Sequence, residues 1–275
     1  METIMKNRST SVILALVLIA CSPLSQAQER PHTINVPLSR PGEPITLDID
    51  LMSARIEVIG EDREDAVFEV TVAGDGQRRI VTPSGALPIR GSSYAIDVEE
   101  DDNEISVDSD HRAGKVTVLA RVPRQANLSL GTINDGAIIV SNIVGNLELS
   151  NTNGPITVRG VTGSVIAESI NAPIDVDFSG LDEIHASSFE TLNGDITVGL
   201  PANAGAQLHL DSGQGYITSD FEVEVEQNGG SVQRDEGRNG TTIRIENVIV
   251  AKVNGGGPVL RLKSLHGNMH IRRVP

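Results

Sequence analysis

A shortage of cysteine is the first feature of this sequence, since Cys21 is the only one among 275 residues. It directly follows an apolar run at residues 12–20, which itself follows the basic residues Lys6 and Arg8. The run is too short to cross a bilayer, which takes about 20 apolar residues. The pattern is typical of a secretory signal peptide. The sequence therefore predicts export, and it predicts neither a disulfide nor a cysteine-ligated metal in the exported chain.

The N-terminal segment offers two processing sites. Small residues at Ser25 and Ala27 suit cleavage after residue 27, which makes residues 1–27 the signal peptide. The stretch LIAC instead resembles the bacterial lipobox, in which residues 1–20 are removed and Cys21 is lipidated. No second apolar stretch of spanning length follows. We therefore expect a location in the periplasm or at the outer membrane or cell surface, with a lipid as the only membrane tie.

Aromatic residues and positive charge are also scarce. The chain has no tryptophan, two tyrosines and four phenylalanines. Globular enzymes usually anchor their cores on aromatic side chains, and sugar sites commonly use them as platforms, so both classes lose support. Lysine and arginine number 22 against 37 acidic residues, which gives a net charge of −15. Such a surface repels phosphate backbones, so we expect no nucleic-acid partner.

What the sequence has in abundance is a short repeat. A turn residue and a variable residue precede an apolar, a variable and another apolar residue, as in Gly154-Pro-Ile-Thr-Val158. Apolar residues two apart lie on one side of a strand, so each unit predicts one strand and one corner. Five copies follow each other at nine-residue steps, and looser copies begin at positions 182, 194, 206, 215, 257 and 267.

Two all-β architectures fit these units. A β-solenoid or β-helix-like stack would coil the strands so that equivalent units lie about 4.8 Å apart, whereas a meander would form an antiparallel sheet or sandwich. The constant step and the lack of aromatics favour the solenoid. Asn-Gly pairs are expected to form its corners with positive φ, at residues 153–154, 193–194, 228–229, 239–240 and 254–255.

The regularity of the repeat divides the chain. Residues 28–44 form an N-terminal segment, and residues 45–130 alternate as strands do, without the nine-residue step. The repeat occupies residues 131–273, with a polar insertion at about residues 222–241. Because the last units of a stack must cover an open core, we expect the irregular β region to cap one end.

Several stretches resemble the bacterial putative-adhesin domain family. They are TNGPITV at 152–158, TLNGDITV at 191–198 and VNGGGPVLRLKSLHGNMHI at 253–271, and the resemblance extends over residues 45–273. It implies an extracytoplasmic β-solenoid-like fold and supplies no catalytic residue. This chain departs from the pattern at Asn171-Ala172-Pro173, where the corner glycine is absent.

If each coil contains two strands, alternate units share an outward face. Thr157, Asp175, Thr197 and Thr218 would then form one column, a candidate docking surface for another chain or a glycan. Glu148, His185 and His209 would stack on the other face, where two histidines about 5 Å apart and a carboxylate suit a metal ion. Both columns also fit the ordinary polar exterior of a solenoid.

The sequence gives less support to an enzymatic function. Solenoid enzymes that act on uronic sugars combine acids and bases on one sheet, and here Asp175 and Asp177 have only Arg159 beside them in the sequence. The sequence therefore predicts an exported structural or interaction (adhesin-like) module of the cell envelope, without catalytic activity or cofactor, whose partner is an envelope protein or glycan. The alternative is a carbohydrate-active or metal-dependent glycan-binding β-helix protein.

Overall fold

The computed structural model describes residues 31–72, 96–109, 115–134, 136–227, 231–237, 240–246 and 248–274. Side chains are described outside residues 227–247. Cys21 and both processing sites lie outside these ranges. The described residues form strands and no helix, so the all-β prediction is confirmed. Within these ranges, no helix is long and apolar enough to span a membrane.

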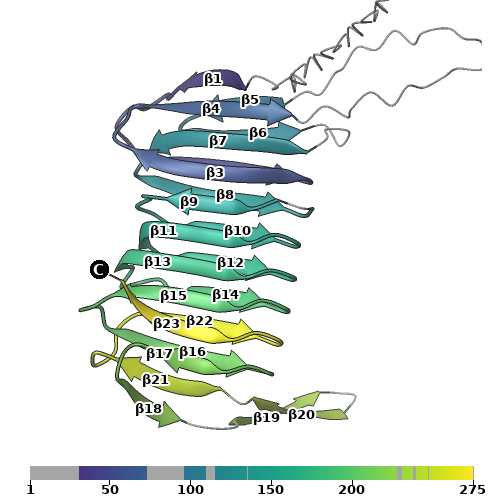
Figure 1. The fold of residues 1–275 in the computed structure, drawn as a ribbon, viewed down its shortest axis with the longest axis vertical. Coiled ribbons are helices and arrows are strands. Elements are labelled where there is room, and N and C mark those ends of the chain that lie inside the picture. The colour runs from purple at the N-terminus through teal and green to yellow at the C-terminus, as the bar shows by residue number, and fades with distance from the viewer. Residues whose placement is uncertain are drawn as a thin grey trace, which may run out of the picture.

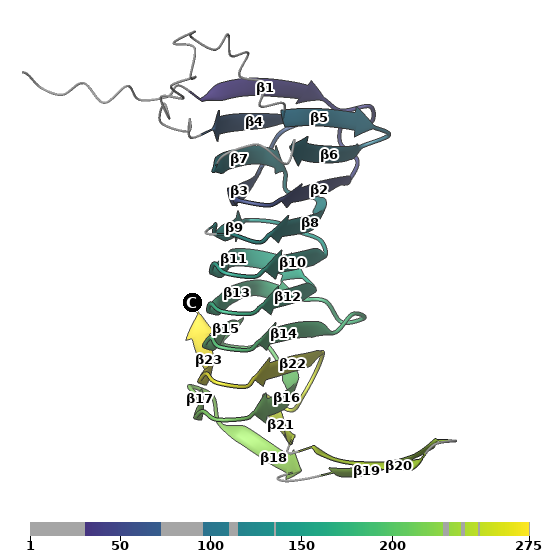
Figure 2. The same cartoon turned by 90° about the vertical axis from the view of Figure 1, so that its right-hand side faces the viewer.

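Most strands belong to two large sheets, which face each other along the molecule (Figures 1 and 2). Sheet A has the order β1 (His32–Pro37), β4 (Asp65–Val72), β7 (Val116–Pro123), β3 (Ala54–Glu61), β9 (Ile138–Ser141), β11 (Ile156–Gly163), β13 (Ile174–Leu181), β15 (Ile196–Pro201), β23 (Met269–Val274) and β17 (Ile217–Ser219).

Sheet B has the order β18 (Val223–Gln227), β21 (Ile249–Val253), β16 (Ala206–Ser212), β22 (Val259–Ser264), β14 (Ser187–Thr191), β12 (Val165–Ser169), β10 (Leu147–Asn151), β8 (Ala126–Thr132), β2 (Ile45–Leu51), β6 (Glu104–Ser109) and β5 (Ile96–Asp101). A separate hairpin of β19 (Ser231–Gly237) and β20 (Gly240–Glu246) extends away from the stack (Figure 2).

From β8 to β15 the chain alternates between the two sheets, and each strand pairs in parallel with the strand two further along. Leu147 lies opposite Val165 and Ile156 opposite Ile174, so these neighbouring strands of one sheet are 18 residues apart, whereas the step from Ile174 to Ile196 is 22 residues. Two of the nine-residue units therefore make one layer, with one strand in each sheet.

The core is a narrow column between the sheets. Inward positions of successive strands are occupied by equivalent apolar residues, such as Ile156, Ile174 and Ile196, each fully buried. Side chains of this size each contribute about 1.5–3 kcal/mol when fully buried. Four phenylalanines enter the core, and two of them, Phe178 and Phe189, form an edge-on pair with ring centroids 6.3 Å apart. Branched aliphatic side chains thus fill a space that is too narrow for a larger aromatic core.

The order of the layers differs from the order of the chain at both ends. The layer of β22 and β23, which is the last in the sequence, lies between the layer of β14 and β15 and that of β16 and β17 (Figure 1). The layer of β2 and β3 likewise lies between that of β6 and β7 and that of β8 and β9. Each of these four strands is therefore held by a strand on either side.

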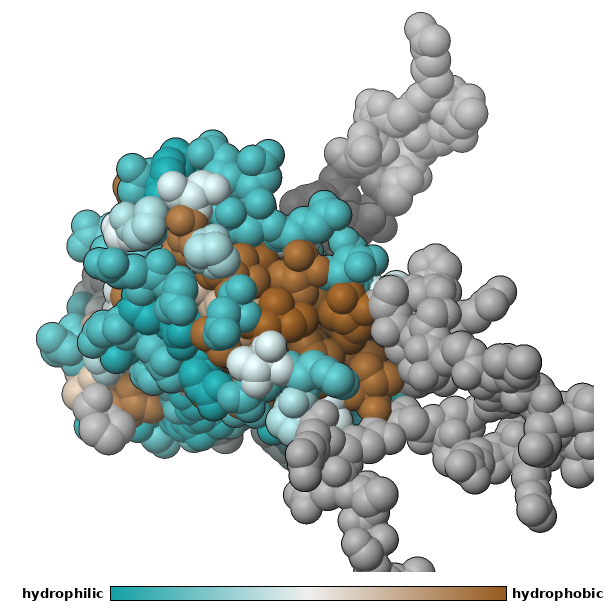
Figure 3. Space-filling model, turned by 90° about the horizontal axis from the view of Figure 1, so that it is seen from above, coloured by the Kyte–Doolittle hydropathy of each residue, from teal (hydrophilic) through white to brown (hydrophobic). Residues whose placement is uncertain are grey.

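Antiparallel strands terminate the stack. β1 and β4 in sheet A and β5 in sheet B close one end, and β21 and β18 continue sheet B at the other. Apolar surface is visible at the β1 end (Figure 3), where Ile34, Ile96 and Val98 pack against the core but are only partly buried.

The Asn-Gly corners work differently from the prediction. Positive φ is found at Asn254 and Gly255, but neither at 153–154 nor at 193–194, so the prediction was wrong there. Gly154 is required by close approach instead, since a Cβ atom on it would lie 1.5 Å from the carbonyl oxygen of Gly136. The pairs at 228–229 and 239–240 include residues outside the described ranges.

The corner asparagines have a second role. The side-chain amide of Asn171 donates a hydrogen bond to Asn153 Oδ1 at 2.8 Å, and that of Asn193 donates to Asn171 Oδ1 at 2.9 Å. This ladder of amides links three successive layers. The corner sequence is thus explained by close backbone packing and by contacts between layers.

Candidate functional site

The column predicted on sheet A is largely formed. Thr157, Asp175 and Thr197 lie opposite one another on β11, β13 and β15. Thr218 belongs to the same column, but His270 lies between it and Thr197 because β23 is inserted between β15 and β17. Thr218 Oγ1 is 2.9 Å from His270 Nδ1.

The carboxylate of this column is occupied by contacts within the chain. Asp175 forms ion pairs with Arg159 and with Arg272, which comes from the inserted strand β23. Asp177 contacts the same two guanidinium groups. Burial works to lower the pKa of Arg272, but the hydrogen bond from its guanidinium to Asp177 and the two carboxylate charges outweigh it and raise this pKa. The sequence indicated that Arg159 was the only basic partner of these two aspartates. The structure adds Arg272 as a second one.

The column predicted on sheet B is only partly correct. Glu148 and His209 share it, but the residues between them are Ile166, Ser188 and Arg261. His185 does not belong to the column, because it lies in the turn between β13 and β14. The expected pair of stacked histidines is therefore not formed. Within the described ranges, no group of three His, Cys, Asp or Glu side chains is arranged to hold a metal ion.

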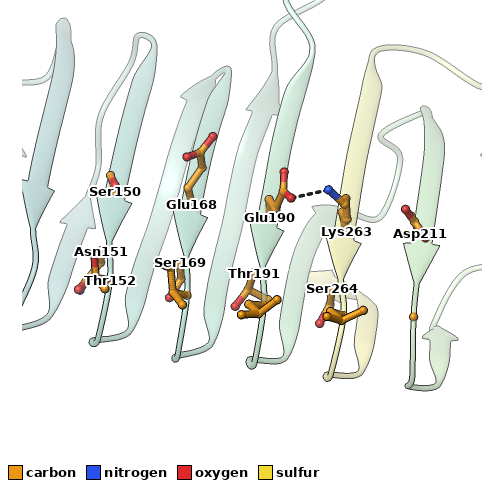
Figure 4. Close-up of a pocket in the computed structure, with 14 residues that line it drawn as sticks. Ser150, Asn151, Thr152, Glu168, Ser169, Glu190, Thr191, Asp211, Lys263 and Ser264 are labelled. Atoms are coloured by element: carbon orange, nitrogen blue, oxygen red, sulfur yellow. Dashed lines mark hydrogen bonds and ion pairs between the residues drawn. The ribbon is translucent and has the colours of Figure 1, made fainter. Parts of the chain in front are cut away.

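The outer face of sheet B carries a groove that the sequence did not indicate. It has a volume of about 470 Å³ and crosses the C-terminal ends of β10, β12, β14, β22 and β16 (Figure 4). A second hollow of about 410 Å³ lies over β2, β8 and β10, and it shares Ser150 and Thr152 with the first. The two hollows together form one surface along the stack, which we call the sheet B groove.

One wall of this groove is acidic. Glu168, Glu190 and Asp211 line the larger hollow, while Asp48, Asp50 and Glu148 line the smaller one. Lys263 is the one lysine or arginine among the lining residues described, and its ammonium group contacts Glu190 at 2.5 Å (Figure 4). These side chains come from neighbouring strands in register, since Glu168 is opposite Glu190 and Lys263 is opposite Asp211.

The other wall is apolar. Its residues each directly follow the last residue of a sheet B strand, and about 43–45% of each is exposed. Backbone hydrogen bonds between layers keep adjacent corners aligned, since the carbonyl oxygens of Ile170 and Leu192 each accept one from a residue in the next layer. We call this set the apolar ridge, and its members are Ile133, Ile170, Leu192 and Leu265. A sequence signal for it existed, because Ile133, Ile170 and Leu192 each immediately precede a corner asparagine.

Beneath the groove, the last residue of each strand points a polar side chain inward. The Asn151 amide and the Thr191 and Ser264 hydroxyls each donate to a carbonyl oxygen at the corner of an adjacent layer. Ser169 has the equivalent position on β12 and is only 7% exposed, but its Oγ has no hydrogen-bond partner. A buried hydroxyl without a partner costs about 1–3 kcal/mol, so Ser169 lacks the contact between layers that its equivalents make.

Comparison with known proteins finds only distant similarity, to solved structures. No family model matches the chain, and no curated protein matches it. A putative cell adhesion protein from Clostridium sporogenes is 12% identical, with a TM-score of 0.46 over 89% of this chain and 100% of its own. A putative adhesin from Bacteroides fragilis is 11% identical, with a TM-score of 0.41 over 90% of this chain and 98% of its own.

Proposed function

We propose that this chain is a non-catalytic, adhesin-like interaction module of the cell envelope, built as a β-solenoid, and that it binds its partner through the sheet B groove. The observation that carries the proposal is the groove itself. Carboxylates and exposed aliphatic side chains repeat on its two walls from one layer to the next. Exposed apolar side chains gathered in a hollow are typical of interaction sites.

The groove is a better candidate than the threonine column of sheet A. Asp175, the charged member of that column, already contacts two guanidinium groups. In the groove, Glu190 is also paired, with Lys263, but the aliphatic ridge beside it is about half exposed. Burial of that ridge by a partner would therefore supply a favourable free energy that the sheet A column does not offer.

A binding experiment separates the two faces. The chain without residues 1–27 is labelled, and its binding to envelope preparations of the producing cell is measured by titration. We expect the Ile170→Ser/Leu192→Ser variant to bind about tenfold more weakly or worse. The matched Thr157→Ala/Thr197→Ala variant should bind as the unaltered chain does, with circular dichroism confirming that both variants are folded. The reverse result would overturn the groove as the docking surface.

The proposal includes export to the periplasm or the cell surface. It is supported by the signal-like residues 1–27 and by the lipobox-like stretch ending at Cys21. Mass spectrometry of the N-terminus of the protein isolated from its own cells tests it. Either Gln28 or an acylated Cys21 as first residue would support export, whereas a retained Met1 would contradict it.

One observation favours the alternative of a carbohydrate-active protein. Acidic and basic side chains lie together on one face of sheet A, namely Asp175 and Asp177 with Arg159 and Arg272. The guanidinium groups already engage both carboxylates, so a proton-abstracting role requires a substrate that displaces them. Release of unsaturated products from a uronic polysaccharide, lost in the Arg272→Met variant, would establish this alternative.

A further inference from the structure

We propose that the ligand of the sheet B groove is an extended, cationic polypeptide segment in which basic and aliphatic side chains alternate. This inference rests on the proposed function, because it names the class of partner for the same site. It is carried by the charge of one wall and the aliphatic chemistry of the other wall.

Charge selects the sign of the partner. Six carboxylates line the two hollows, and Lys263 is the one lysine or arginine among the described lining residues. The whole chain carries a net charge of −15. A nucleic acid, an anionic lipid surface or the same groove of a second copy would all meet repulsion here. A cationic partner instead gains favourable contacts with Glu168 and Asp211 as it docks.

The two walls select an alternating pattern. Side chains of an extended polypeptide point to opposite sides at successive residues. A segment that lies along the groove can therefore direct basic side chains towards Glu168 and Glu190, and aliphatic ones towards Ile170, Leu192 and Leu265. Four strand-to-strand steps separate β10 from β16, which is about 19 Å. About six extended residues span that length.

The apolar ridge favours a polypeptide over an amino sugar. Its side chains are aliphatic, and aliphatic groups of a peptide can pack against them at van der Waals distance. A sugar would bring hydroxyl groups that need polar partners, which Ile170, Leu192 and Leu265 do not supply.

Synthetic probes test this inference directly. The main probe is a short, blocked, fluorescent peptide that alternates lysine and leucine. One control peptide replaces each lysine by glutamine, and another replaces each leucine by serine. Binding of each to the chain without residues 1–27 is measured by fluorescence anisotropy at about 50 mM salt, where screening is weak. We expect the lysine–leucine peptide to bind at least about tenfold more tightly than either control.

Protein variants locate the binding. Glu168→Gln/Glu190→Gln should weaken binding of the lysine–leucine peptide about tenfold. The control variant, Glu64→Gln/Glu222→Gln, removes the same charge from exposed positions outside the groove and should bind normally. Equal loss in both double variants would mean attraction by net charge alone and would overturn the inference.

The outcomes also separate this inference from the proposed function. If an oligomer of amino sugars binds in the groove and the peptide does not, the partner class is wrong and the docking surface stands. The same conclusion follows if no peptide binds but Ile170→Ser/Leu192→Ser still abolishes envelope binding. If that variant retains envelope binding and no peptide binds, both proposals fail.

Discussion

At the scale of single residues, Asp182 explains why one predicted strand is absent. The sequence Asp182-Glu-Ile-His-Ala186 has the apolar alternation of a strand, yet the structure places it in a turn. The Asp182 carboxylate accepts hydrogen bonds from the backbone N–H groups of Ile184 and His185. Ile184, predicted to face the core, is 86% exposed. A local side-chain-to-backbone contact thus competes successfully with the strand pattern.

This contact predicts a pH dependence. The hydrogen bond with the His185 ring, followed by those from the two backbone N–H groups, lowers the pKa of Asp182 from 3.8 to about 2. Because the pKa is lowered in the folded chain, the stabilisation of the turn is present above about pH 4 and is lost as the pH falls towards 2. A carboxyl titration followed by NMR should give that midpoint.

Amide exchange of Ile184 and His185 provides the control for the same contact. Asp182→Ala should speed exchange at both amides near neutral pH, whereas Glu183→Gln, at the neighbouring position, should leave them unchanged. Unaltered exchange in Asp182→Ala would show that the carboxylate does not hold the turn.

At the scale of elements, Arg272 shows how an inserted strand is attached. Arg272 on β23 and Asp177 on β13 both lie opposite Gly199 of the strand between them, β15. The guanidinium reaches across this glycine and contacts Asp177 at 2.6 Å and Asp175 at 2.9 Å. A Cβ atom on Gly199 would lie 2.0 Å from Asp177 Oδ1. The missing side chain therefore leaves room for a bridge over three strands.

We expect Gly199→Ala to lower the free energy of unfolding by about 1–3 kcal/mol, because the added methyl group displaces the bridge. Denaturant titration of the single variants Gly199→Ala and Arg272→Met and of the double variant gives the coupling between them. The alanine should cost less in the Arg272→Met background. Strictly additive costs would mean that the methyl group acts through other contacts.

The same elements show what a sequence can predict. Between residues 136 and 176 the apolar alternation correctly predicted which side chains are buried, because parallel neighbours there are only 18 residues apart. At β22 the predicted pattern was shifted by one residue, since Leu260 and Leu262 are buried instead of Val259 and Arg261. The register of β22 is determined by its neighbours β14 and β16, which are remote in the sequence.

At the scale of the whole molecule, the inserted layers limited prediction of the candidate site. The sheet B groove combines Glu168 and Glu190 with Lys263 from β22 and Asp211 from β16, and the last two follow each other in space in the reverse of their chain order. No local pattern encodes that order. Three of the four ridge residues were predictable in principle, because Ile133, Ile170 and Leu192 precede corner asparagines, but the position of the ridge beside the acidic wall required the topology.

The inserted layer predicts how the molecule responds to truncation. Removal of residues 259–275 takes away β22 and β23. β16 and β17 thereby lose their parallel partner, and β14 and β15 each lose one of two. We expect hydrogen exchange by mass spectrometry to show lost protection in these four strands, most of all in β16 and β17, while β9 to β13 stay protected because both of their partners remain. Removal of residues up to 38, which eliminates only β1, should affect mainly its partner β4. If β16 and β17 kept full protection without β22 and β23, the C-terminal layer would not be the link that joins the last part of the stack to the rest.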